Sequence, residues 1–167
     1  MSETYSGSCF CGAVKYRLTS KPMFVHCCHC RDCQQQVGSA FAINAIIERD
    51  RIELLCGEPV PTEMKTDSGR PHDIYRCPNC LSALWSDYGR RKVMVFVRVA
   101  TLEAPSALPP DVHIFTRSKV GWVDLSHPAP GATTGRPAGV FEAYYDMKTE
   151  WPADSQARRA ALLGQGK

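Results

Sequence analysis

Residues Cys77-Pro78-Asn79-Cys80 form a short motif in which two other residues separate a pair of thiols. The proline presets a tight turn, and such a turn brings both sulfurs to one side. Backbone N–H groups within the turn can also donate hydrogen bonds to the thiolates. The motif is therefore typical of a zinc knuckle, which supplies half of a tetrahedral metal site.

Five further cysteines lie in two clusters nearer the N-terminus, Cys9-Phe10-Cys11 and Cys28-His29-Cys30-Arg31-Asp32-Cys33. Residues two apart on extended backbone point to the same side, so Cys9 and Cys11 can supply the other half of the knuckle site. Cys28 and Cys30 share a side in the same way. Cys33 can join them if a helical turn begins there, because residues three apart share a helix face.

The seven clustered cysteines divide as four plus three. Four thiolates close a structural zinc site, whereas three protein ligands leave a position for water or substrate, as in catalytic zinc sites. Spacing alone also allows Cys77 and Cys80 to pair with the middle cluster instead. We predict two zinc ions, with the second site open and only partly occupied.

Composition narrows the class of protein. The chain has 167 residues, 44% of them hydrophobic and 22% charged, which suits one globular domain. A net charge of +3 with scattered basic residues argues against a nucleic-acid partner. The first residues do not resemble a secretory signal and the apolar runs are strand-sized, so we expect a cytoplasmic protein with no membrane partner. Cytosolic thiols stay reduced, so nine cysteines indicate metal binding rather than disulfides.

Turn residues separate short runs of β-branched and aromatic residues, which predicts a mainly β fold. The expected strands are Ala13–Leu18, Phe41–Ile47, Arg51–Leu55, Asp73–Arg76, Ala83–Ser86 and Lys92–Ala100. The last of these is apolar on both faces near its centre, so we place it in the middle of a sheet.

Two short helices and two loops complete the predicted elements. One helix runs from Arg31 to Val37 and ends at Gly38. The other covers Ser155–Gly164 with Asp154 as its cap, and its Ala and Leu face is expected to pack on the body of the protein or on a second copy. Proline-rich and glycine-rich composition predicts loops at Glu103–Pro110 and Ser126–Gly139.

Several short elements, in order and spacing, resemble the glutathione-dependent formaldehyde-activating enzyme family, which includes centromere-protein-V-like domains. They are Gly7-Ser8-Cys9-Phe10-Cys11-Gly12, Cys28-His29-Cys30-Arg31-Asp32-Cys33, Gly38-Ser39-Ala40-Phe41, Cys77-Pro78-Asn79-Cys80, His113-Ile114-Phe115 and Gly121-Trp122. The resemblance implies a β-tent-like zinc fold over residues 1–125. Residues 126–167 are then an extension, which we expect to pack on the same domain.

The resemblance also implies a structural zinc held by Cys9, Cys11, Cys77 and Cys80, and a catalytic zinc held by Cys28, Cys30 and Cys33. The implied activity is that of a zinc-dependent carbon–sulfur lyase acting on a glutathione–aldehyde adduct or a related small electrophile. Two alternatives remain at this point: a zinc-assisted hydrolase of a carbonyl or imine-like compound, and a zinc binding module without catalysis. Glutathione or another thiol is the expected small-molecule partner.

Other reactive side chains receive simpler interpretations. Cys56 is expected to be a small buried hydrophobic residue, and Cys27 a buried thiol that points away from the open site. His29 should project opposite its flanking sulfurs and form a hydrogen bond rather than bind zinc. For His26, His113 and Trp122 we expect ordinary packing, with a place in the wall of a pocket as the alternative.

Overall fold

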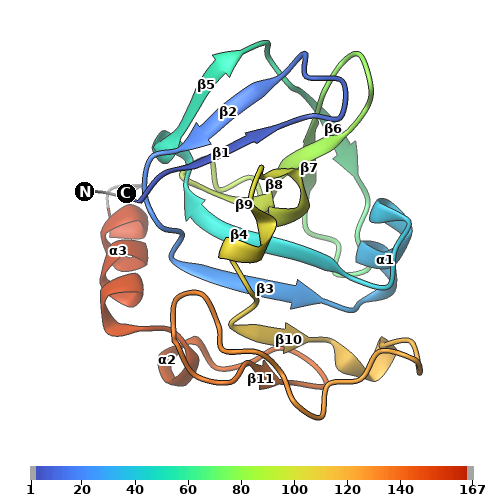
Figure 1. The fold of residues 1–167 in the computed structure, drawn as a ribbon, viewed down its shortest axis with the longest axis vertical. Helices are drawn as coiled ribbons and strands as arrows, with labels where there is room; N and C mark the ends of the chain where they lie inside the picture. The colour runs from blue at the N-terminus through green and yellow to red at the C-terminus, as the bar shows by residue number, and fades with distance from the viewer. Residues whose placement is uncertain (1–2, 165–167) are drawn as a thin grey trace. The chain divides into compact units, whose positions relative to one another are not determined.

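The computed structural model describes residues 3–164, and the chain divides into two compact units. The first unit contains the residues up to Pro22 and Ile46–Pro105, and the second contains Met23–Ala45 and the residues from Ser106 onward. The boundary falls inside strand β4 (Ala42–Glu48), so each unit includes part of this strand. Strands predominate and the helices are short (Figure 1), which confirms the predicted mainly β fold with short helices.

In the first unit, β1 (Tyr5–Ser8), β2 (Lys15–Leu18) and β5 (Ile52–Cys56) form an antiparallel sheet with β2 at its centre. The other strands follow β4 in the order β9, β8, β7 and β6. Their bounds are Met94–Arg98 for β9, Ala83–Tyr88 for β8, His72–Arg76 for β7 and Val60–Met64 for β6. Strand β9 therefore has a neighbour on each side, as its apolar sequence predicts. Two 3-10 turns, η1 (Arg49–Arg51) and η2 (Val99–Thr101), complete the unit, and a third, η3 (Pro105–Ala107), lies at its boundary.

Aromatic side chains form the centre of this unit. Tyr16 and Trp85 are fully buried and meet edge to face, with ring centroids 5.5 Å apart. The Arg49 guanidinium lies 5.2 Å from the centroid of Trp85, within the range of a cation–π contact. Gly7 is required beside this cluster, because a Cβ atom at that position would lie only 2.5 Å from the Tyr16 ring.

In the second unit the strand order is β11, β10, β3 and β4. Strands β3 (Phe24–Cys28), β10 (Val112–Ile114) and β11 (Gly139–Val140) lie side by side, and β10 runs parallel to both neighbours (Figure 1). Helix α1 (Arg31–Val37) follows β3 and ends where Gly38 adopts a left-handed conformation, as predicted. A 3-10 turn, η4 (Thr116–Ser118), follows β10.

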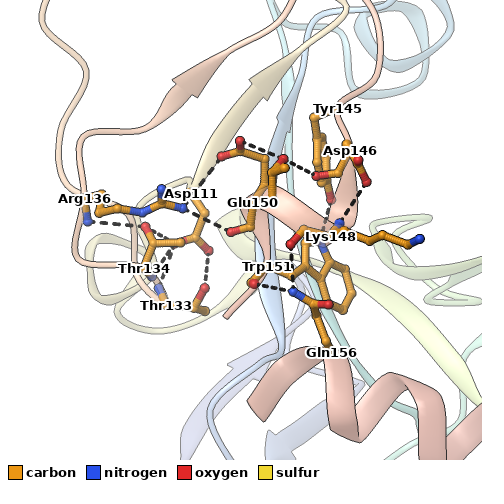
Figure 2. A network of polar contacts seen from close by, with 11 residues as sticks. Asp111, Thr133, Thr134, Arg136, Tyr145, Asp146, Lys148, Glu150, Trp151 and Gln156 are labelled. Atoms are coloured by element: carbon orange, nitrogen blue, oxygen red, sulfur yellow. Dashed lines mark hydrogen bonds and ion pairs between the residues drawn. The ribbon is translucent and has the colours of Figure 1, made fainter. Parts of the chain in front are cut away.

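The C-terminal stretch of this unit forms a network of polar contacts that includes Asp111, beside β10 (Figure 2), and contacts β3 through aromatic side chains. Asp111 precedes β10 and accepts hydrogen bonds from Thr133 and Thr134. The Trp151 ring stacks on Phe24 with centroids 5.3 Å apart. The Trp151 indole also donates to the Tyr145 hydroxyl, and that hydroxyl lies 2.5 Å from Nε2 of His26. His26 is buried, as expected for a packing residue.

Two short helices, α2 (Met147–Glu150) and α3 (Ala153–Gly164), end the described chain. Helix α3 begins two residues earlier than predicted, so the expected cap at Asp154 is wrong. The backbone N–H of Gln156 donates to the carbonyl of Pro152, which makes Pro152 the residue at the helix start and places Asp154 in the first turn. Within residues 3–164, no helix has the length and apolar character needed to cross a membrane.

Candidate metal centres

A first cluster contains the four cysteines Cys9, Cys11, Cys77 and Cys80, all in the first unit. Their sulfurs lie within 4.8 Å of one another, so the structure brings together the two pairs that the sequence places far apart. The Cys9–Cys11 and Cys11–Cys77 sulfur distances are 3.6 and 3.8 Å. Four sulfurs at about 2.3 Å from a tetrahedral ion would be separated by about 3.8 Å. The residues present therefore fit a metal ion of this geometry.

Local hydrogen bonds prepare this cluster to carry negative charge. The backbone N–H of Val14 donates to the Cys9 sulfur, and the side-chain amide of Asn79 donates to the Cys11 sulfur, each at 3.2 Å. A hydrogen bond from the Ser82 hydroxyl is the largest influence that lowers the pKa of Cys80, to about 5. Donors aimed at sulfur favour the thiolate, which is the form that binds metal.

A second cluster contains Cys28, Cys30 and Cys33 in the second unit, where β3 passes into α1. Cys30 is the N-terminal cap of α1, and its sulfur accepts a hydrogen bond from the Cys33 backbone N–H. The Cys28 and Cys30 sulfurs are 3.4 Å apart. Among the described residues, no further Cys, His, Asp or Glu joins this group. Three convergent sulfurs therefore leave one position of a tetrahedral ion for another ligand.

Charge within the second cluster is unevenly shared. Hydrogen bonds from Cys28 and Cys33 lower the pKa of Cys30 strongly, and the same contacts raise the pKa of Cys28. These contacts therefore favour the thiolate at Cys30 and the thiol at Cys28. Cys28 is buried whereas Cys30 and Cys33 are partly exposed, so the cluster is accessible from one side.

An open pocket of about 400 Å³ lies against the helix that carries Cys33. Its lining comes from α1, the turn after α1, and the segment after η4: Arg31, Gln34, Gln35, Gly38, Ser39, Ala40, Val120 and Trp122. Gln34 is buried and holds this region together by donating to the carbonyls of His29 and Ser118. Trp122 is 77% exposed, so the expectation that it packs in the core is wrong and its place is in the pocket wall.

A third group, formed by Cys27, His29 and His113, was not predicted as a cluster. Cys27 and His29 are buried, as expected, and Nε2 of His29 lies 3.5 Å from the Cys27 sulfur. Nδ1 of His113 lies 3.1 Å from the same nitrogen. Burial is the main influence that raises the pKa of Cys27 to about 12 and lowers that of His29 to about 4. The i, i+2 spacing of Cys27 and His29 is a signal for a shared side, but no sequence spacing places His113 beside them.

Cys56 belongs to none of these groups and is exposed, so the prediction of a buried residue is wrong. It ends β5, which pairs with β2 and, among the described residues, is the edge strand of its sheet. Leu54 and Leu55 of the same strand are also exposed, at 39% and 46%. An apolar sequence at a sheet edge does not guarantee burial.

The chain is similar to two known proteins, one by sequence and one by structure. The chain is 29% identical over 124 residues to a Halomonas elongata protein provisionally named glutathione-dependent formaldehyde-activating enzyme. The match covers 71% of this chain and 79% of that protein. A solved structure of a Rhodobacter sphaeroides protein is 22% identical with a TM-score of 0.45, covering 59% of this chain and 87% of the other.

A family model described as glutathione-dependent formaldehyde-activating enzyme matches residues 4–118. That range includes both all-cysteine clusters and the group formed by Cys27, His29 and His113. It covers more than half of the chain, and the predicted family resemblance is therefore confirmed. The chain belongs to the glutathione-dependent formaldehyde-activating enzyme family.

Proposed function

We propose that this protein is a zinc enzyme that joins a small thiol to an aldehyde and, in reverse, acts as a carbon–sulfur lyase. Cys9, Cys11, Cys77 and Cys80 would hold a structural zinc, and Cys28, Cys30 and Cys33 would hold a catalytic zinc. Sulfur-rich tetrahedral donor sets favour zinc or iron–sulfur centres over hard cations. The observation that carries the proposal is the convergence of the sulfurs of buried Cys28 and of the partly exposed Cys30 and Cys33, with no fourth protein ligand among residues 3–164.

The reaction in the forward direction consumes a thiol and formaldehyde. The thiol loses its proton, the sulfur forms a bond to the carbonyl carbon, and the carbonyl oxygen takes up a proton to become a hydroxyl group. With glutathione the product is S-hydroxymethylglutathione, and the reverse reaction breaks the same carbon–sulfur bond. Zinc, when bound, supplies positive charge that stabilises a thiolate or polarises a carbonyl.

The residues around the second cluster have separate tasks in this proposal. Cys28, Cys30 and Cys33 fix the position of the charge. The neighbouring pocket offers the Arg31 guanidinium for a substrate carboxylate and the exposed Trp122 ring for its apolar parts. Glutathione carries two carboxylates and a thiol, so it matches a cationic pocket wall beside a thiolate-accepting centre.

Exchange spectroscopy tests the activity directly. Glutathione and ¹³C-formaldehyde form the adduct slowly without a catalyst, and zinc-loaded wild type should accelerate exchange between free and adduct carbon. Cys30→Ser should remove the acceleration, whereas Cys56→Ser, which alters an exposed thiol outside the clusters, should leave it intact. Equal exchange rates with wild type, with Cys30→Ser and without protein would refute the proposal. Release of a hydrolysis product from a carbonyl or imine substrate would favour the hydrolase instead.

A further inference from the structure

We propose that Cys27, His29 and His113 form a separate metal site, which takes a borderline divalent ion such as Zn²⁺ on the opposite face of β3 from Cys28. This site does not depend on the proposed enzymatic activity. It uses none of the seven cysteines assigned to the other two centres.

Strand geometry brings the three side chains together. Strands β3 and β10 pair in parallel with Cys27 directly opposite His113, so these two side chains share a face. The backbone N–H of His29 continues the ladder by donating to the carbonyl of Ile114. His29 therefore follows Cys27 at an i, i+2 spacing on extended backbone and points to the same face. Cys28, between them, points to the other.

The distances fit tetrahedral coordination. With metal–nitrogen bonds of about 2.05 Å and a metal–sulfur bond of about 2.3 Å, ligand nitrogens should be about 3.3 Å apart and sulfur and nitrogen about 3.5 Å apart. The structure gives 3.1 Å between Nε2 of His29 and Nδ1 of His113. It gives 3.5 Å between the same Nε2 and the Cys27 sulfur. The three ligand atoms all lie within 4.8 Å of one another.

A purely hydrogen-bonded arrangement accounts for these contacts less well. Nε2 of a neutral imidazole has either one proton or one in-plane lone pair, so it makes one good hydrogen bond. Here two neighbours approach this single nitrogen, and His29 is 0% exposed. An ion at the centre would use one lone pair from each imidazole and the Cys27 thiolate, whose proton would pass to solvent. The two ring nitrogens and the Cys27 sulfur would then all bind the ion, so that His113 and Cys27 no longer compete for a hydrogen bond to Nε2 of His29.

This site should bind metal more weakly than a site whose histidine ligands each donate their other ring N–H to a hydrogen-bond acceptor. With Nε2 of His29 on the ion, the ring proton sits on Nδ1, which is buried and has no hydrogen-bond partner in the part of the chain described. Loss of such an outer partner typically costs about 10- to 100-fold in metal affinity. Residues 3–164 provide only three protein ligands, and His113 is partly exposed, so water or an exogenous ligand can complete the coordination.

Zinc X-ray absorption separates this site from the other two, because those contain only sulfur ligands from the protein. Full-length protein freed of any histidine tag is titrated with Zn²⁺, and bound zinc is counted. Wild type should reach three ions per chain and show the multiple scattering of coordinated imidazole. Cys27→Ala and His113→Asn should each bind one ion fewer and lose the imidazole signal.

Matched controls are the exposed residues Cys56 and His127, changed to Ala and Asn. Both controls should keep three ions. Unchanged far-UV circular dichroism would show that Cys27→Ala still folds, and His113→Asn, at a partly exposed position, gives an independent test. The proposal is overturned if wild type shows no imidazole scattering and binds as many ions as both site variants. Loss of one all-sulfur ion in Cys30→Ser, with imidazole retained, would show that the sites are independent.

Discussion

Replacing Asp111 by Asn should destabilise the second unit although the side chains have nearly the same shape. Asp111 is 2% exposed, and its two oxygens accept five hydrogen bonds. One oxygen receives the backbone N–H groups of Thr133 and Thr134 and the Thr134 hydroxyl. The other receives the backbone N–H of Val25, on β3, and the Thr133 hydroxyl.

Asn has only one carbonyl oxygen, so its amide group must replace one of these two acceptors. If the Asn amide nitrogen faces β3, the Val25 N–H loses its acceptor and meets another donor. If the nitrogen faces residues 133–134, two backbone N–H groups lose their acceptor. A buried unsatisfied donor costs about 1–3 kcal/mol, and the lost bonds to a charged oxygen add to this, so we expect about 2–4 kcal/mol. At a urea m-value of about 2 kcal/mol/M, the unfolding midpoint should fall by about 1–2 M.

The matched control is Asp146→Asn, the same chemical change at an exposed position. Asp146 caps α2 by accepting the Lys148 backbone N–H, and Asn caps helices about as well as Asp. Its midpoint should stay within error of wild type when both are measured by urea unfolding at saturating zinc. If Asp111→Asn unfolded at the same urea concentration as the control, the carboxylate would not be the anchor that joins β3 to residues 133–134.

Three further predictions concern the metal centres and the knuckle. Cys77→Ser should unfold or insolubilise the protein, whereas Cys30→Ser should stay folded with less metal, because closed zinc sites supply folding free energy. If thermal melting showed Cys30→Ser to be as destabilised as Cys77→Ser, the assignment of the closed structural site would be wrong. Glutathione should bind more tightly as pH rises and release a proton, since the thiol must ionise to reach zinc. Calorimetry in two buffers of different ionisation enthalpy counts that proton, and equal affinity for S-methylglutathione would contradict thiolate capture. Leu81→Gly should stabilise the protein by up to about 1 kcal/mol. Leu81 has a φ of 61° and is 65% exposed, so the removed left-handed strain of about 1–2 kcal/mol outweighs the backbone entropy that glycine loses on folding. A lower melting temperature for this variant would show that the Leu81 side chain contributes packing.

Local spacing predicts the individual cysteine pairs, whereas the pairing of Cys77 and Cys80 with Cys9 and Cys11 came from the family resemblance. The turn at Cys77–Cys80 and the i, i+2 pairs are each set by a few consecutive residues, so the sequence predicts them well. The same holds for α1, which Gly38 ends with a φ of 62°. The central strand β9 was also predictable, because burial on both faces leaves an apolar run without alternation.

Features that depend on long-range pairing of strands are not predicted by the local sequence. His113 is 84 residues from His29, and only the parallel pairing of β10 with β3 brings the two together. Strand β3 is missing from the predicted strands, because Phe24 and Val25 are followed by His26 and two cysteines instead of a longer run of β-branched and aromatic residues. The predictions that Cys56 and Trp122 are buried are wrong for a related reason. Apolar character predicts burial only when another element covers the residue, and none of the described elements covers these two fully.

The alternation of β3 explains why this chain can hold two groups of metal-type ligands within seven residues. On extended backbone, neighbours point to opposite faces, so Cys27 cannot serve as a spare ligand for the ion that Cys28 and Cys30 would hold. The structure accordingly separates Cys28, Cys30 and Cys33 from Cys27, His29 and His113. A shift of one residue in the pairing of β3 with β10 would move His113 away from Cys27 and His29 and break up that group, whereas Cys28, Cys30 and Cys33 lie on one continuous segment. The network around Asp111, which bonds to the backbone of Val25 on β3, therefore stabilises the register on which the group formed by Cys27, His29 and His113 depends.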